Sequence, residues 1–158
     1  MMERSMVELL AEHPFTSDLS EEQRENLGHI AKVDTFAPND FLIQEGRPAD
    51  AFFLIVNGLV AIELFLPGRG VRRLQTVAPG SAVGWSWMVV PNHWEFDARA
   101  LESTTAIILP AMPLQKLIER DCNLGFQLTR KLLLVVAERL KAARLQLLDV
   151  YGPPSGVG

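Results

Sequence analysis

The side chains best suited to contact a ligand gather in one segment, residues 80–98, with the sequence GSAVGWSWMVVPNHWEFDA. All three tryptophans of the chain lie there, and its large apolar side chains are Trp85, Trp87, Met88, Trp94 and Phe96. Together they offer a polarisable surface for an apolar or aromatic ligand. The alternative is that the rings plug the space and stiffen the fold. The residue types alone leave both interpretations open.

Seven residues are our candidates for ligand contacts: Gly84, Trp85, Ser86, Trp87, Trp94, Phe96 and Arg99. The Ser86 hydroxyl and the backbone amides after Gly84 are only weak anion donors. Arg99 would reach a ligand only if its side of a strand faces inward, and an exposed strand position is the alternative. The polar residues of the segment either orient a ligand or lie in a solvated loop; they are Asn92, His93 and Glu95.

Other catalytic and metal-binding patterns are missing from the sequence. The three histidines, at positions 13, 29 and 93, lack the H-x-H or H-x-x-x-H spacing that a metal site on a β-roll would need. There is no G-x-S-x-G or Walker lysine motif, and the single cysteine, Cys122, has no evident histidine partner. We therefore predict that the chain is not an enzyme, that no cofactor is certain, and that a small molecule is its possible ligand. A cupin-like enzyme is the least favoured alternative.

Short strands and tight turns must position this segment, and they are clearest over residues 41–62, FLIQEGRPADAFFLIVNGLVAI. Residues 41–43 are a short apolar run, and Pro48 fixes the loop that follows. Residues 51–56 are apolar and too few for an ordinary helix, which predicts a strand. Asn57-Gly58 predicts a two-residue hairpin, with residues 59–66 as the returning strand.

The remaining turn signals complete the predicted fold. A hairpin tip at 67–70 precedes a strand over 71–77, and residues 95–102 and 104–109 are predicted to pair as the last strands. Ser20 and Gln23 have the spacing of a capping box at the start of a second helix. The predicted fold class is α+β: a jelly-roll-like antiparallel β-roll of the double-stranded β-helix type over about 33–110, with helices in 2–31 and 111–149.

A long helix is predicted from about residue 123 to 149. Residues at alternating spacings of three and four form a heptad seam: Phe126, Thr129, Leu133, Val136, Leu140, Ala143 and Leu147. A second stripe lies on a neighbouring face: Leu124, Leu128, Leu132 and Val135. One stripe can pack on the roll while the other needs a partner, or both form one wide stripe inside a monomer. The basic residues of the helix indicate a solvated face: Arg130, Lys131, Arg139, Lys141 and Arg144.

The stretch 41–62 resembles the cyclic-nucleotide-binding domain family, the sensor half of catabolite-activator-type proteins. The family spacing F-L-x-x-E-G-x-x-x-D-x-x-F/Y-x-I-x-x-G-x-V is met by Phe41, Leu42, Glu45, Gly46, Asp50, Phe53, Ile55, Gly58 and Val60. So many fixed positions in some twenty residues make a specific match. The resemblance implies a β-roll and a homodimer formed through the long C-terminal helix.

In this family a phosphate-binding cassette follows the middle strands, with the pattern G-D-x-F-G-E-x-A-L-L-x-x-x-P-R-x-A-T-V. The resemblance implies that its Glu binds the ribose 2′-hydroxyl and its Arg the cyclic phosphate. Here Gly80 and Gly84 match, but Trp85 stands at the Glu position and Trp94 at the Arg position. An indole carries no charge. Losing one partner of a buried charge pair costs roughly 2–5 kcal/mol, tens- to thousands-fold in affinity.

We therefore predict one domain over residues 1–150 with a disordered tail over 151–158. Its predicted function is a stand-alone sensory module with a degenerate cassette, and the alternative is a true cyclic-nucleotide receptor that uses other contacts. A homodimer is expected, and a separate signalling partner is a second expectation. The net charge of −4 and the lack of room for a helix-turn-helix indicate no nucleic acid. No membrane span is predicted, and we expect a cytoplasmic location.

Overall fold

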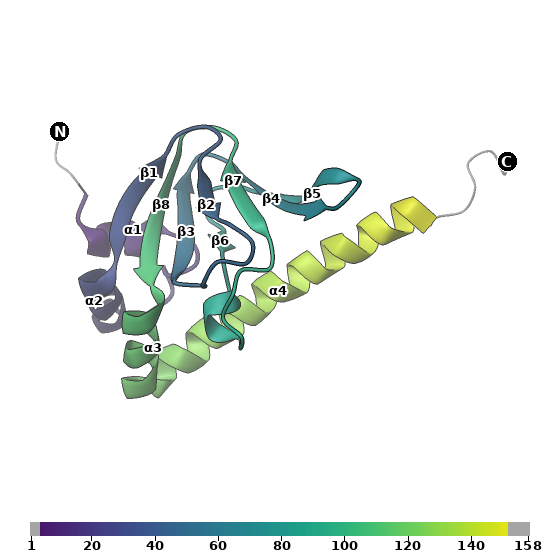
Figure 1. Cartoon of the computed structure of the whole chain (residues 1–158). Helices are drawn as coiled ribbons and strands as arrows, with labels where there is room; N and C mark the ends of the chain where they lie inside the picture. Colours follow the sequence, from purple (N-terminus) through teal and green to yellow (C-terminus); the bar gives the residue numbers. More distant parts are fainter. Residues whose placement is uncertain (1–3, 152–158) are drawn as a thin grey trace, which may run out of the picture.

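The computed structural model describes residues 4–151 and arranges the strands in two antiparallel sheets (Figure 1). One sheet has the order β1 (Lys32–Phe36), β8 (Thr104–Pro110), β3 (Ala51–Asn57) and β6 (Ala82–Val83). The other has the order β2 (Phe41–Ile43), β7 (Asp97–Ala100), β4 (Val60–Leu66) and β5 (Gly70–Val77). The apolar faces of both sheets contribute to one core. The predicted β-roll is confirmed.

The predicted hairpin at Asn57-Gly58 is wrong, because the chain crosses there from one sheet to the other. β3 pairs with β6 and β8, whereas β4 pairs with β5 and β7. Gly58 has φ +98°, and a Cβ at this position would lie 2.4 Å from the Thr104 hydroxyl oxygen. The positive φ that suits a hairpin turn thus serves a tight crossing beside another strand.

The prediction that the last two strands pair with each other is also wrong. β7 lies in one sheet between β2 and β4, and β8 lies in the other between β1 and β3. Residues 101–103 make another crossing beside the one at Gly58, and there the Leu101 N–H donates to the Leu59 carbonyl at 2.8 Å. The hairpin between β4 and β5 has the predicted tip, since Leu66 pairs with Gly70.

Two capped helices precede the roll. α1 (Met6–Glu12) has a capping box from Ser5 and Glu8, and α2 (Glu21–Ile30) has the predicted box from Ser20 and Gln23. An N-cap of this kind stabilises a helix by about 1 kcal/mol. In the linker between them, the His13 ring nitrogens contact the Ile55 carbonyl at 2.9 Å and the Phe15 N–H at 3.1 Å.

α3 (Ala111–Arg120) and α4 (Cys122–Tyr151) follow the roll, and Figure 1 shows α4 starting beside α3 and running past the roll toward the hairpin of β4 and β5. The predicted inner stripe packs on the body, because Leu124, Leu128 and Leu132 are fully buried. α4 extends two residues beyond the predicted end, and residues 152–158 of the predicted tail lie outside the described part of the chain. Within residues 4–151 no helix combines the length and the apolar character that crossing a membrane requires.

Lys131, Arg139 and Gln146 of α4 make polar contacts with three other parts of the described chain. Lys131 Nζ lies 2.5 Å from a carboxylate oxygen of Asp18. Farther along, an Arg139 guanidinium nitrogen donates to the Ala82 carbonyl. Nearer the end, Gln146 Nε2 donates to the Leu74 carbonyl at 2.5 Å. The buried apolar contacts at Leu124, Leu128 and Leu132 are thus followed, farther along α4, by the single hydrogen bonds of Arg139 and Gln146.

Candidate ligand-binding site

The segment 80–98 leaves one sheet at β6 and joins the other at β7, with a short 3-10 helix, η1 (Ser86–Met88), between them. The amide of Asn92 closes the loop by donating to the Ser86 and Trp87 carbonyls at 3.2 and 2.9 Å. Trp94 is fixed by its backbone, which donates to the Arg47 carbonyl at 2.9 Å and accepts from Gly46 at 2.8 Å. The loop is thus tied to the neighbouring loop between β2 and β3.

The aromatic rings of this segment lie inside the fold. Trp87, Trp94 and Phe96 are 1%, 4% and 7% exposed and belong to the hydrophobic core, while Trp85 is half-buried. The rings of Trp85 and Phe96 have centroids 6.5 Å apart. Trp87 instead packs against Phe52 of β3, with centroids 5.8 Å apart. The candidate rings therefore do not form one cluster: Trp85 packs with Phe96 just before β7, and Trp87 packs with Phe52 of the other sheet.

The Trp94 ring covers the backbone at Gly84. Gly84 has φ +91°, and a Cβ there would meet Trp94 Cη2 at 2.8 Å and Ile43 Cδ1 at 3.1 Å. No side chain fits between this glycine and the ring. The structure thus brings together Gly84 and Trp94, the positions where the family pattern has its second glycine and its arginine.

Three consecutive residues carry buried polar atoms without a hydrogen-bond partner among the described residues. These are Trp85 Nε1, Ser86 Oγ and Trp87 Nε1. All three can donate a hydrogen bond, and none carries a charge. Leaving such a group without a partner costs about 1–3 kcal/mol. The unused hydrogen-bond donors of the segment are therefore uncharged and buried.

The structure does not bring Arg99 to these rings. Its neighbours Ala98 and Ala100 are fully buried, so the arginine projects from the opposite side of β7. There it makes two hydrogen bonds to Glu63, at 2.8 and 3.0 Å, and one to the Asn39 side chain at 2.6 Å. The hydrogen bond from Arg99 is the main cause that lowers the pKa of Glu63. Arg99 is thus held in an ion pair.

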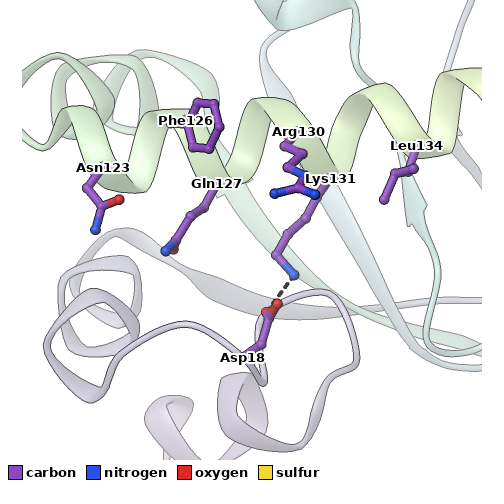
Figure 2. Close-up of a pocket in the computed structure, with 7 residues that line it drawn as sticks. All are labelled: Asp18, Asn123, Phe126, Gln127, Arg130, Lys131 and Leu134. Atoms are coloured by element: carbon purple, nitrogen blue, oxygen red, sulfur yellow. Dashed lines mark hydrogen bonds and ion pairs between the residues drawn. The ribbon is translucent and has the colours of Figure 1, made fainter.

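Sequence reasoning did not find a cavity of about 440 Å³ on one side of α4, shown in Figure 2. Its lining residues are Asp18, Asn123, Phe126, Gln127, Arg130, Lys131 and Leu134. Lys131 crosses it to Asp18 and lies 5.7 Å from the centroid of the Phe15 ring. This hydrogen bond is the main cause that lowers the pKa of Asp18. Two of the charged residues that line the cavity, Lys131 and Asp18, are therefore paired with each other.

A second cavity, of about 270 Å³, lies between α4, the end of β5 and the turn before β6. Arg139 lines it and is partly buried, although the sequence analysis placed this residue on a solvated face. A signal was present: Arg139 follows Val135 at a spacing of four and so continues the inner stripe. Among the described residues no group of three histidine, cysteine or acidic side chains is arranged to hold a metal ion.

A family model described as "Cyclic nucleotide-binding domain" matches residues 33–121, more than half of the chain. A cyclic nucleotide-binding domain from Methylobacillus flagellatus KT has a TM-score of 0.78 at 20% identity, covering 96% of this chain and 85% of that one. A putative cyclic nucleotide-binding protein from Geobacter metallireducens GS-15 has a TM-score of 0.75 at 24% identity, covering 87% and 99%. At these identities the two structures show the fold alone.

A curated relative is named Glutaminase 1, from Bradyrhizobium diazoefficiens. The two sequences are 30% identical over 134 residues, which is 85% of this chain. The chain spans only 21% of the length of that protein.

Proposed function

The chain belongs to the cyclic nucleotide-binding domain family, and from that premise we propose that it is a sensory or regulatory module that binds cAMP and cGMP weakly or not at all. The observation that carries this proposal is the pair of indoles, Trp85 and Trp94, at the positions of the family's glutamate and arginine. A cyclic phosphate needs a cation or several well-placed donors. The two indoles offer neither a charge nor more than one donor each.

The burial of the rings supports a plug more than a pocket. Trp94 is 4% exposed and its ring lies against Gly84, so the space beside the second glycine is filled. Trp87 and Phe96 are also core residues. A nucleotide that entered here would have to displace buried aromatic surface, at a cost of roughly 1.5–3 kcal/mol for each ring left exposed.

We propose in addition that the module forms a homodimer through α4. Four apolar residues of the predicted seam are 56–66% exposed on the single chain: Phe126, Leu133, Leu140 and Leu147. Ala143 is exposed as well, whereas Val136 is half-buried. A row of exposed apolar side chains spaced by seven residues is typical of a coiled-coil surface. A change in the roll would pass through this helix to the twin chain or to a separate signalling partner.

Calorimetric titration of the purified chain with cAMP and with cGMP tests the proposed weak binding. We expect dissociation constants weaker than about 100 μM, since each missing charged contact removes at least tenfold in affinity. A catabolite-activator-type protein titrated in the same buffer is the positive control. Binding of either nucleotide at micromolar or lower concentration to the unmodified chain would overturn the proposal.

One observation favours the second candidate, a true receptor that uses other contacts. Trp85 Nε1, Ser86 Oγ and Trp87 Nε1 have no hydrogen-bond partner among the described residues, and the acceptor oxygens of a nucleotide would supply one. The same titration separates the two candidates.

We do not carry a glutaminase reaction over to this chain, because the matched segment is a fifth of that protein. We propose a role without catalysis, and the predictions of a stand-alone module and a cytoplasmic location remain predictions. The cupin-like enzyme is the remaining alternative, and stoichiometric metal in the purified protein would revive it.

A further inference from the structure

Arg139 of α4 has a guanidinium group that the rest of the described chain satisfies only in part. One of its terminal nitrogens donates to the Ala82 carbonyl. The other, Nη1, is buried and has no hydrogen-bond partner within the described residues. Arg139 also takes part in none of the ion pairs formed within residues 4–151. The group therefore has donor capacity inside the molecule that nothing in the described chain uses.

An unpaired buried guanidinium is energetically costly and does not escape by losing its proton. Burial lowers the pKa of Arg139 to about 10, so the group stays cationic at neutral pH. Removing a cation from water without an anionic partner costs several kcal/mol. Proteins meet this cost by pairing the cation with a carboxylate or phosphate, whose oxygens match the planar fork of arginine. The ligand chemistry that fits this position is thus an oxyanion.

The cavity of about 270 Å³ beside Arg139 provides room for such a group. Its lining also includes Gln75 and Thr76 from the end of β5 and Ser81 from the turn before β6. These residues supply amide and hydroxyl donors. Glu138 lines the cavity as well, and it disfavours ligands with a large negative charge. The volume lies just below the range of about 300–1,000 Å³ typical of drug-sized ligands, which indicates a small one.

We propose that this cavity, between α4, β5 and the turn before β6, binds the phosphate or carboxylate group of a small molecule, with Arg139 as its principal partner. The site shares the first residues of segment 80–98, but none of its lining residues is one of the candidate rings Trp85, Trp87, Trp94 and Phe96. It joins the turn that begins segment 80–98 to the helix of the proposed dimer. An anion bound there would strengthen the contact between the roll and α4.

Thermal unfolding of the whole chain in potassium phosphate and in sodium succinate tests the proposal, with potassium chloride at equal ionic strength as the reference. The variants are Arg139→Met, which removes the cation, and Arg144→Met, a matched control at an exposed position of the same helix. For the unmodified chain and Arg144→Met we expect the Tm to rise with the logarithm of anion concentration, by roughly 5–10 °C at a hundred times Kd. Arg139→Met should lose this response.

The comparison between variants separates binding from general salt effects, because phosphate strengthens burial in any protein. Without added anion, Arg139→Met should unfold at the same or a higher temperature than the unmodified chain, since it removes an unpaired buried charge. A response to phosphate alone identifies a phosphate ligand, and a response to succinate alone identifies a carboxylate. An equal response of Arg139→Met and the unmodified chain, or no response of the unmodified chain to either anion, would overturn the proposal.

A calorimetric titration of Arg139→Met with cAMP keeps this inference distinct from the proposed function. Tight cAMP binding to the unmodified chain that Arg139→Met abolishes would support the oxyanion site and overturn the proposed weak nucleotide binding. Phosphate or succinate binding without cAMP binding would support both proposals. If neither phosphate nor succinate binds and cAMP does not bind either, the proposed oxyanion site is overturned and the proposed weak nucleotide binding stands.

Discussion

His13 is held by two contacts that only its neutral form can make together. Nε2 lies 2.9 Å from the Ile55 carbonyl and must donate, while Nδ1 lies 3.1 Å from the Phe15 N–H and must accept. A proton added to Nδ1 would oppose a second donor. Burial is the main cause that lowers the pKa of His13 from its ordinary value of 6.5.

His13 therefore makes the folded state less stable as the pH falls. Below about pH 6.5 the unfolded chain takes up a proton at this histidine and the folded chain does so only at lower pH, so the free energy of unfolding decreases in that window. Nitrogen-15 NMR at pH 6.0 should show His13 as the neutral Nε2–H tautomer, with His13→Gln used to assign the signal. A doubly protonated ring in the folded protein at that pH would contradict the prediction.

At the scale of single residues, the sequence predicted well which side chains form a group, but it predicted poorly on which side of an element a side chain lies. The tryptophans and Phe96 were recognised as one group from their types, and the structure buries all but the half-buried Trp85. Arg139 was assigned to a solvated face and Arg99 was left with two alternatives, because the side of an element on which a residue lies depends on distant packing. Only the structure pairs Arg99 with Glu63 and places Arg139 beside Ala82.

At the scale of elements, the adjacent crossings at Gly58 and at residues 101–103 depend on this glycine. A methyl group at this position would lie within 2.6 Å of the Ser103 carbonyl and the Thr104 Cα, which are backbone atoms and cannot turn aside. Gly46 has a similar φ, +85° against +98°, but nothing lies within 4 Å of its Cβ position. Comparing substitutions at the two glycines therefore distinguishes the cost of steric overlap from the cost of a positive φ.

Replacing each glycine by alanine should reveal this difference. Gly46→Ala introduces only the strain of positive φ, about 1 kcal/mol, whereas Gly58→Ala adds the overlap and should cost at least about 3 kcal/mol. Urea denaturation of both variants measures the two free energies of unfolding. Equal losses would mean that the crossing at residue 58 tolerates a side chain.

Most elements were predicted from local patterns, but not their partners in the sheets. Strand lengths, capping boxes and the tip at 67–70 follow from neighbouring residues. Whether Asn57-Gly58 makes a hairpin or a crossing depends on where Thr104 lies, 46 residues after Gly58. Turn residues indicate the local backbone conformation, but they do not determine with which strand the next segment pairs.

At the scale of the whole molecule, the exposed seam on α4 predicts the assembly. Leu140→Glu would place a charge at the centre of the seam and should yield a monomer at concentrations where the unmodified chain is a dimer. Leu145→Glu is the matched control, because Leu145 is equally exposed, 54% against 56%, and lies outside the predicted seam. Multi-angle light scattering measures the mass of each. A monomeric unmodified chain at high concentration would refute the seam, and equal effects of the two variants would contradict its position.

The three single contacts along α4, at Lys131, Arg139 and Gln146, determine how the helix is oriented on the roll. Each can be exchanged for water at a net cost of about 0.5–1.5 kcal/mol, so together they resist bending much less than an apolar interface would. We therefore expect the part of α4 beyond Leu132 to tilt on the roll at a lower energetic cost than the buried part before it. In a dimer, the twin helix would pass such a tilt on to the second chain.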